Sequence, residues 1–242
     1  MSGRADGHIY AMSAPLLFIP GLTCTAEILV PHLVALWAEA PVMVASPRRG
    51  RSMAEIARHI LADAPPRFAL AGFSMGGYLS FEILRQAPER VERLALIDTQ
   101  ARADTAEATE RRRAGMALAQ AGKFGLAIAS SFPNAVHPDH QNDESLRALH
   151  TRMALAIGPD TYRDQQEAII GRSDSRDLLP TIGVPTTVLV GEGDLLTPPA
   201  LSREMADAIP HARLQIIAGA GHMALAETPM PVQAALVDWL RA

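Results

Sequence analysis

The chain has 242 residues, of which 48% are hydrophobic, with one cysteine and a formal net charge of −4. This length and apolar content suit one α/β domain, or one domain with an insertion, around a sizeable core. A slightly acidic chain lacks the cationic surplus that attracts nucleic acid, so we expect no nucleic-acid partner. The lone cysteine excludes an internal disulfide and fits a reducing compartment.

No stretch is apolar for long enough to span a membrane, and the first fifteen residues lack the apolar block of a signal peptide. The sequence therefore predicts a cytoplasmic protein.

Six short apolar runs predict buried strands separated by helices. These runs do not alternate with polar residues, which is typical of parallel strands covered on both faces. They span residues 16–19, 42–45, 68–71, 94–97, 187–190 and 214–217. Strand, helix and strand in succession predict an α/β fold with a doubly wound, mostly parallel sheet.

Two of the intervening helices have clear starting signals. The stretch Ser52-Met53-Ala54-Glu55 predicts a capping box, in which the serine and glutamate side chains bind free amides of the first turn. Thr228 followed by Pro229 predicts the start of the last helix. Its apolar face has helical spacing and comprises Val232, Ala235, Leu236, Trp239 and Leu240.

The strand and helix alternation fails between about residues 100 and 180. This segment is alanine-rich and charged, and we expect its helices to be broken at Pro133, Pro138 and Pro159. We interpret residues 100–180 as a helical insertion between two strands of one sheet. Residues 1–99 and 181–242 then form the core.

Residues 72–76, Gly72-Phe73-Ser74-Met75-Gly76, follow a buried strand and precede a helix. A G-x-S-x-G sequence in this context predicts a sharp turn that presents the serine hydroxyl above the sheet. A helix-capping role for Ser74 is the plainer alternative, but capping alone does not explain glycines on both sides. We therefore interpret Ser74 as a nucleophile.

A serine nucleophile needs a base and a group that orients the base. His222 and Asp194 follow the last two predicted strands, so both would lie at the same edge of the sheet as Ser74. Asp98, at the end of an earlier strand, is a rival for the acid. His137 and His140 lie in a proline-broken loop, and we expect them to face solvent rather than bind a metal.

Three motifs, GFSMGG, GEGDLLTPP and GHMALAETP, occur in the order serine, acid, histidine. In this order the chain resembles the α/β-hydrolase superfamily from residue 16 to residue 239. The resemblance implies a catalytic triad of Ser74, Asp194 and His222. It also implies an oxyanion hole formed by the backbone amides of Leu22 and Met75, with no metal or organic cofactor.

The resemblance implies a serine hydrolase that cleaves a small-molecule carboxylic ester through an acyl-enzyme intermediate. A thioester, a lactone or a carbon–carbon bond stays open as the cleaved bond, as does a non-hydrolytic receptor or lyase on the same fold. The insertion is expected to form a lid. A homodimer contact made by its helices stays open as an alternative. Five of its apolar residues are candidates either for the pocket or for the lid core: Met116, Phe124, Phe132, Met153 and Tyr162. Cys24 is expected to be a buried, unreactive thiol.

Overall fold

Six parallel strands form one sheet in the computed structural model, which describes residues 14–242. The amino-terminal stretch examined for a signal peptide, with His8, lies largely outside these described residues. The strand order is β2-β1-β3-β4-β5-β6, and every neighbouring pair is parallel. The strands are β1 (Leu16–Ile19), β2 (Val42–Val44), β3 (Phe68–Phe73), β4 (Val91–Ile97), β5 (Thr186–Gly191) and β6 (Arg213–Ile217). The predicted doubly wound α/β sheet is confirmed.

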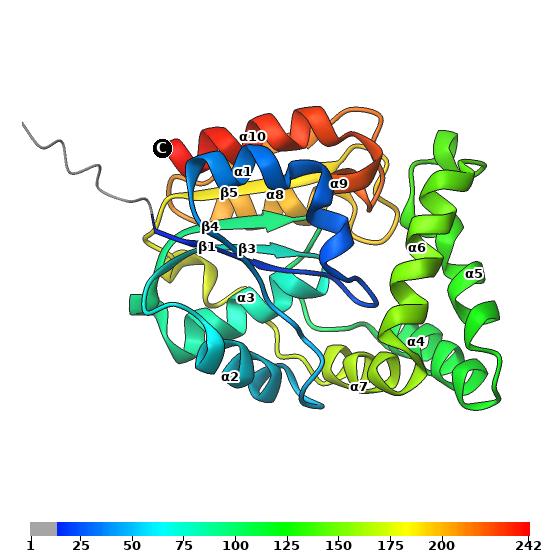
Figure 1. The fold of residues 1–242 in the computed structure, drawn as a ribbon. Helices are drawn as coiled ribbons and strands as arrows, with labels where there is room; N and C mark the ends of the chain where they lie inside the picture. Colours follow the sequence, from blue (N-terminus) through cyan, green and yellow to red (C-terminus); the bar gives the residue numbers. More distant parts are fainter. Residues whose placement is uncertain (1–13) are drawn as a thin grey trace, which may run out of the picture.

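Helices cover both faces of this sheet (Figure 1). One face carries α1 (Leu33–Glu39), preceded by the 3-10 helix Ala26–His32, together with α9 (Ala224–Glu227) and α10 (Pro229–Arg241). The other face carries α2 (Met53–Asp63), α3 (Met75–Gln86) and α8 (Pro199–Ala208). None of the helices within residues 14–242 has the length and apolar character needed to cross a membrane.

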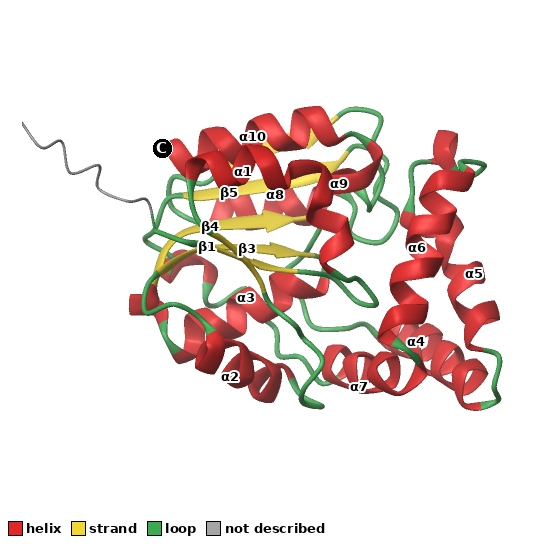
Figure 2. Cartoon of the chain, viewed as in Figure 1, coloured by secondary structure: helices red, strands yellow, loops and turns green. Residues whose placement is uncertain are grey.

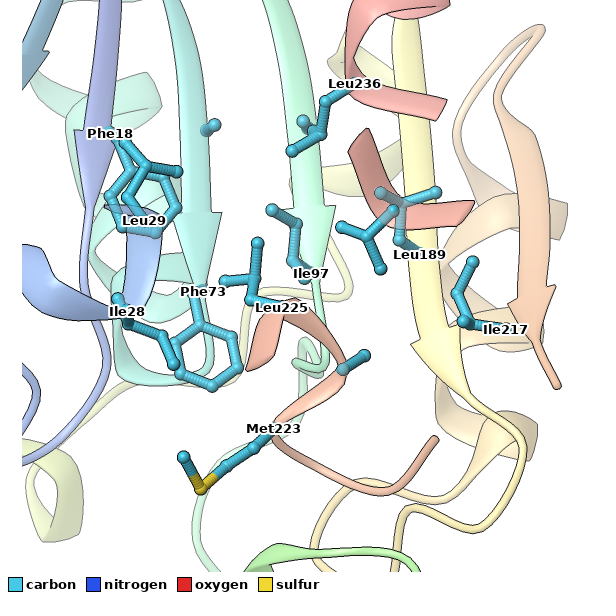
Figure 3. Packing of buried hydrophobic residues seen from close by; sticks show 14 of the residues in the cluster. Phe18, Ile28, Leu29, Phe73, Ile97, Leu189, Ile217, Met223, Leu225 and Leu236 are labelled. Carbon is cyan, nitrogen blue, oxygen red and sulfur yellow. The ribbon is translucent and has the colours of Figure 1, made fainter. Parts of the chain in front are cut away.

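The core forms because apolar side chains on each face of the strands meet the apolar faces of these helices. On the first face, Ile97 and Leu189 from two strands lie near Leu236 of α10, and Phe18 lies against Leu29, as Figure 3 shows. The predicted apolar face of the last helix is confirmed, since all five of its residues are buried. Ser52 also caps α2 as predicted, accepting a hydrogen bond from the amide of Glu55 at 3.2 Å.

Four helices separate β4 from β5 and lie beyond the carboxyl ends of the strands, toward which the arrowheads in Figure 2 point. They are α4 (Ala106–Gln120), α5 (Phe124–Ala135), α6 (Glu144–Ile157) and α7 (Pro159–Ile170). The predicted break at Pro133 is wrong, because Pro133 lies inside α5. The helix ends two residues later, so the proline removes a hydrogen bond only from the final turn. Pro138 and Pro159 do lie at helix starts, as expected.

Four strands are longer than the sequence predicts: β3 and β5 by two residues, β4 by three and β6 by one, whereas β2 ends one residue earlier. Strand β4 begins at Val91 and includes Glu92 and Arg93, whose charges hide the start of the strand in the sequence. Arg93 is accommodated because its guanidinium donates to the carbonyl oxygens of Trp239 and Leu240 at 2.7 and 2.9 Å. Strand β3 runs on to Phe73, so the next residue, Ser74, stands directly at the turn into α3.

Helix α3 approaches the sheet so closely that glycine is required on its inner side. A β-carbon on Gly76 would collide with the carbonyl oxygen of Ile19 in β1, and one on Gly77 would collide with the side chain of Thr99. Because the obstacle at Gly76 is backbone, only a movement of the helix or the strand could relieve it. Gly76 therefore sets the distance between α3 and the sheet.

We expect Gly76→Ala to lower the free energy of unfolding by roughly 1–3 kcal/mol, the usual cost of overpacking a filled core. Gly125→Ala in α5 is a matched control, because a β-carbon there would meet nothing within 4 Å. A helical alanine is favoured over glycine by about 1 kcal/mol, so this control should be neutral or stabilising. Urea denaturation of both variants measures the difference. Equal stability of the two would contradict the assigned role of Gly76.

Candidate active site

Ser74 occupies a strained backbone conformation between β3 and α3. Its φ of 53° and ψ of −114° lie in a region that residues other than glycine seldom adopt. Such a conformation costs about 1–3 kcal/mol and persists only where the surroundings hold it. Here the Ser74 amide donates to the carbonyl oxygen of Ile97 at 2.9 Å, and the Thr99 hydroxyl donates to the Ser74 carbonyl at 2.8 Å. The side chain of Ser74 is thereby held out of the helix.

The structure brings Ser74, His222 and Asp194 into one chain of hydrogen bonds. Ser74 Oγ lies 2.8 Å from His222 Nε2, and His222 Nδ1 lies 2.8 Å from Asp194 Oδ2. Both distances suit strong hydrogen bonds, and the chain leaves Nε2 free to accept the serine proton. The Phe73 ring lies against the imidazole, with 5.7 Å between ring centroids. The serine therefore has both partners that a nucleophile needs.

Asp194 is buried but keeps a strong preference for its ionised form. Burial raises the pKa of this carboxyl, yet the neighbouring His222 and several hydrogen bonds lower it by more, so the net pKa lies below the ordinary value. The amides of Leu196 and Thr197 donate to Oδ1 at 2.8 and 2.9 Å, and the Thr197 hydroxyl donates to Oδ2 at 2.7 Å. A carboxylate held in this way fixes the imidazole and stabilises its charged form.

Asp98, the rival acid, lies elsewhere in the hydrogen-bond network. Its carboxyl accepts from the amides of Gly191 at 2.8 Å and Ala224 at 3.3 Å, and in the described part of the chain no hydrogen bond joins it to His222. Burial, and then the charge of Asp194, hold the pKa of Asp98 well above its usual range. Asp98 thus connects the end of β5 to the start of α9.

The two residues predicted to form an oxyanion hole, Leu22 and Met75, lie in backbone segments next to Ser74. Met75 is the first residue of α3, so its amide has no partner within the helix. Leu22 lies in the turn after β1, and this turn runs beside the serine: a β-carbon on Gly21 would lie 3.1 Å from Ser74 Cβ. The helix dipole adds positive potential at the same place.

Glu227 organises the loop of the candidate base, a role that the sequence analysis missed. Its side chain is fully buried and accepts from the amides of Gly221 at 2.9 Å and Met223 at 3.1 Å, which flank the histidine. The same carboxylate accepts from the amide of His137 at 2.7 Å and lies 2.8 Å from His140 Nδ1. The expectation that these two histidines face solvent is therefore wrong: His140 is bound to a buried carboxylate, and the His137 side chain is largely covered.

Thr197 and Glu227 both lie inside the motifs quoted from the sequence. A threonine three residues after an aspartate is a common partner for its carboxylate, so GEGDLLTPP carries a signal for Thr197. GHMALAETP contains Glu227, but nothing in the sequence shows that it reaches the loop at residues 137–140. That contact arises only from the fold.

Cys24, the other candidate nucleophile weighed in the sequence, is buried. Burial raises the pKa of the Cys24 thiol to about 12, against a smaller opposing effect of its hydrogen bond with Gly21, so the thiol stays protonated at neutral pH. Within residues 14–242 no group of three or more histidine, cysteine, aspartate or glutamate side chains is placed to hold a metal ion.

Comparison with known proteins identifies the family. A family model described as the alpha/beta hydrolase fold matches residues 53–229. The chain belongs to the α/β-hydrolase family. This α/β hydrolase is 29% identical to a putative carbamate hydrolase of Azorhizobium caulinodans, over 94% of the chain and 92% of the relative. It is also 29% identical to a pimeloyl-[acyl-carrier protein] methyl ester esterase of Neisseria meningitidis, over 80% and 79%. A thermophilic esterase from Thermogutta terrifontis has a similar structure, with a TM-score of 0.86 and 28% identity over 95% of this chain and 90% of that one.

We expect Asp98→Asn to change how the stability of this α/β hydrolase depends on pH. Because the pKa of Asp98 is raised, the folded protein retains a proton that the unfolded chain releases above pH 4 or so. Folded wild type therefore loses stability relative to the variant as the pH rises above about 4. Asparagine also tolerates the left-handed backbone of this residue, whose φ is 44°.

Denaturation of wild type and Asp98→Asn across this pH range measures the effect. Asp207→Asn, at an exposed position on α8, controls for the loss of one carboxyl group. Parallel stability curves for wild type and Asp98→Asn would contradict the raised pKa.

Proposed function

We propose that this protein is a serine hydrolase that cleaves a small-molecule carboxylic ester through an acyl-enzyme intermediate. The observation that carries the proposal is the unbroken chain from Ser74 Oγ through His222 to Asp194, with 2.8 Å at each step. A chain of this kind activates a hydroxyl at neutral pH.

The mechanism follows from the positions of these groups. His222 Nε2 accepts the Ser74 proton as the hydroxyl oxygen attacks the acyl carbon of the ester. Asp194 holds the proton on Nδ1 and stabilises the imidazolium. His222 then gives the proton to the departing alcohol, and the acyl group stays on Ser74. Water, deprotonated by the same imidazole, attacks the acyl carbon; the bond to Ser74 Oγ then breaks, His222 returns the proton to Oγ, and the acid is released.

The negative charge that forms on the acyl oxygen needs fixed donors. The amides of Leu22 and Met75 are proposed to fill this role, because both belong to backbone segments next to Ser74. Each such donor contributes about 3 kcal/mol to the stability of a tetrahedral intermediate in a comparable site.

Helices α4–α7 are proposed to act as a lid that shapes the acyl or alcohol pocket. Met116, Phe124 and Tyr162 form an apolar cluster in these helices, and Leu22 packs against that cluster from the oxyanion turn. Phe132 and Met153 belong instead to the main core. An apolar lid surface next to Leu22 favours an uncharged acyl or alcohol group.

The relatives support ester cleavage but also name another acyl bond. Two are esterases, and one is a putative carbamate hydrolase. Esters and carbamates share the same attack on an acyl carbon, so the triad serves either. We favour the ester because both the structural neighbour and one sequence relative act on esters.

We expect wild type to hydrolyse p-nitrophenyl esters with a rate that depends on acyl length, measured from acetate to dodecanoate. The lid cluster limits the space beside Leu22, so the longest chains should react slowest. Ser74→Ala is the control and should leave only background hydrolysis. Turnover that survives in Ser74→Ala would contradict the proposal, as would the absence of turnover on every ester.

We expect the two aspartates to differ sharply when each is replaced by asparagine. Asp194→Asn should lower kcat by about 10⁴, because the imidazole loses its orientation, and His222→Ala should lower it at least as much. Asp98→Asn should change kcat far less, since Asp98 binds backbone amides and not the imidazole. Steady-state kinetics on the best ester measures these effects. A greater loss in Asp98→Asn than in Asp194→Asn would overturn the assignment of the acid.

A further inference from the structure

The turn that carries the Leu22 amide is held in an unfavourable conformation. The amide of Cys24 donates to the carbonyl oxygen of Gly21 at 3.1 Å, which closes a four-residue turn. Thr23 occupies the third position with a φ of 57°. This position normally requires glycine or asparagine, and a β-branched residue is strongly disfavoured there. Some other part of the protein must hold the turn.

Gln165 of α7 supplies the restraint. Its Oε1 accepts a hydrogen bond from the amide of Thr23 at 3.1 Å, across 142 positions of sequence. Its Nε2 donates to the carbonyl oxygen of Pro47 at 3.0 Å. Only 1% of Gln165 is exposed, so both halves of its amide are used in a site without competing water. The acceptor at Pro47 and the donor at Thr23 together fix which way the Gln165 amide points.

Loss of this contact would release the turn. The Thr23 amide would be left buried without a partner, which is costly, since Thr23 is only 7% exposed. Rotation of the peptide between Leu22 and Thr23 would relieve both the positive φ and the unpaired amide. The same rotation would break the contact between the Thr23 hydroxyl and the Leu22 carbonyl, which are 2.6 Å apart. The Leu22 amide belongs to the adjoining peptide of the same turn, so a change in the turn would also loosen the restraint on its direction.

We propose that Gln165 is a positioning residue, which holds the oxyanion turn in its reactive form from the helical insertion. This inference rests on the proposed function, because it requires the Leu22 amide to stabilise an oxyanion. It assigns to α7 a task beyond covering the site. The insertion would preorganise one of the two oxyanion donors through a single side-chain amide.

The test measures the rate at which a fluorophosphonate labels Ser74, because the phosphoryl oxygen of this probe occupies an oxyanion hole and no natural substrate is needed. Gln165→Met preserves the length of the side chain and removes both hydrogen bonds. Gln166→Met is the matched control: Gln166 is buried on the same helix, but it bonds Arg112 at 2.9 Å and not the turn. Thermal unfolding confirms that each variant is folded.

We expect Gln165→Met to label roughly ten- to a hundredfold more slowly than wild type, which is less than the full loss of one oxyanion donor. With an ester substrate the loss should fall on kcat, with KM changed by about twofold at most. Gln166→Met should label at nearly the wild-type rate. Equal losses in the two variants would overturn the inference, because a general weakening of the lid would then explain them.

A double-mutant cycle with Thr23→Gly tests the route through the turn. Glycine adopts the required positive φ without strain, so in this background Gln165→Met should cost much less than it does beside Thr23. The same fold loss in both backgrounds would overturn the role of the turn. Failure of wild type itself to label at Ser74 would overturn the proposed function, and the inference with it. Normal labelling of both wild type and Gln165→Met would overturn the inference alone.

Discussion

The strained backbone of Ser74 is the constraint from which the site is built. A serine with a φ of 53° at the start of a helix is stable only if its neighbours leave no other conformation. The last residue of β4 accepts its amide hydrogen, Thr99 binds its carbonyl oxygen, and Gly76 lets α3 lie directly against β1. The core on both faces of the sheet thus contributes to the position of one hydroxyl group. The hydrogen bond between Ser74 Oγ and His222 Nε2 follows from that position.

Three buried carboxyl groups around the site serve different purposes because their surroundings differ. Asp194 receives three hydrogen bonds besides its contact with the imidazole, and these favour its charge. Asp98 is fully buried, accepts from two backbone amides and lies near the charge of Asp194, so its pKa is raised. Glu227 binds the amides on both sides of the histidine and reaches the loop before α6. The position of His222 therefore depends on several buried carboxyl groups and not on Asp194 alone.

The sequence predicts those elements of the fold and the site that depend on residues close together in the chain. The apolar strands, the cap at Ser52 and the turn at Ser74 each carry a signal within a few residues, and the family resemblance orders the rest. The contacts of Gln165 and His140 were out of reach, because each joins segments separated by 142 and 87 positions. The predicted helix break at Pro133 is wrong for a related reason. A proline indicates that a helix end is near, but only the structure shows that α5 ends two residues after it. Motifs predict the candidate reacting residues, and contacts between distant segments hold those residues in place.

The helical insertion contacts the loops of Asp194 and His222 as well as the turn at residues 21–24. A β-carbon on Gly193, next to Asp194, would meet the His137 ring, and one on Gly221, next to His222, would collide with the backbone at Val136. Glycine at both positions therefore allows the insertion to pack against the loops of the acid and the base. These contacts make the geometry of the two loops depend on the position of α4–α7.

The most direct test of this account is to map the site of fluorophosphonate attachment by mass spectrometry of the digested wild-type protein. The account predicts a single adduct, on the peptide that contains Ser74, which disappears in Ser74→Ala and forms far more slowly in His222→Ala. No adduct on the folded protein, or an adduct on another residue, would contradict the claim that Ser74 is an activated nucleophile.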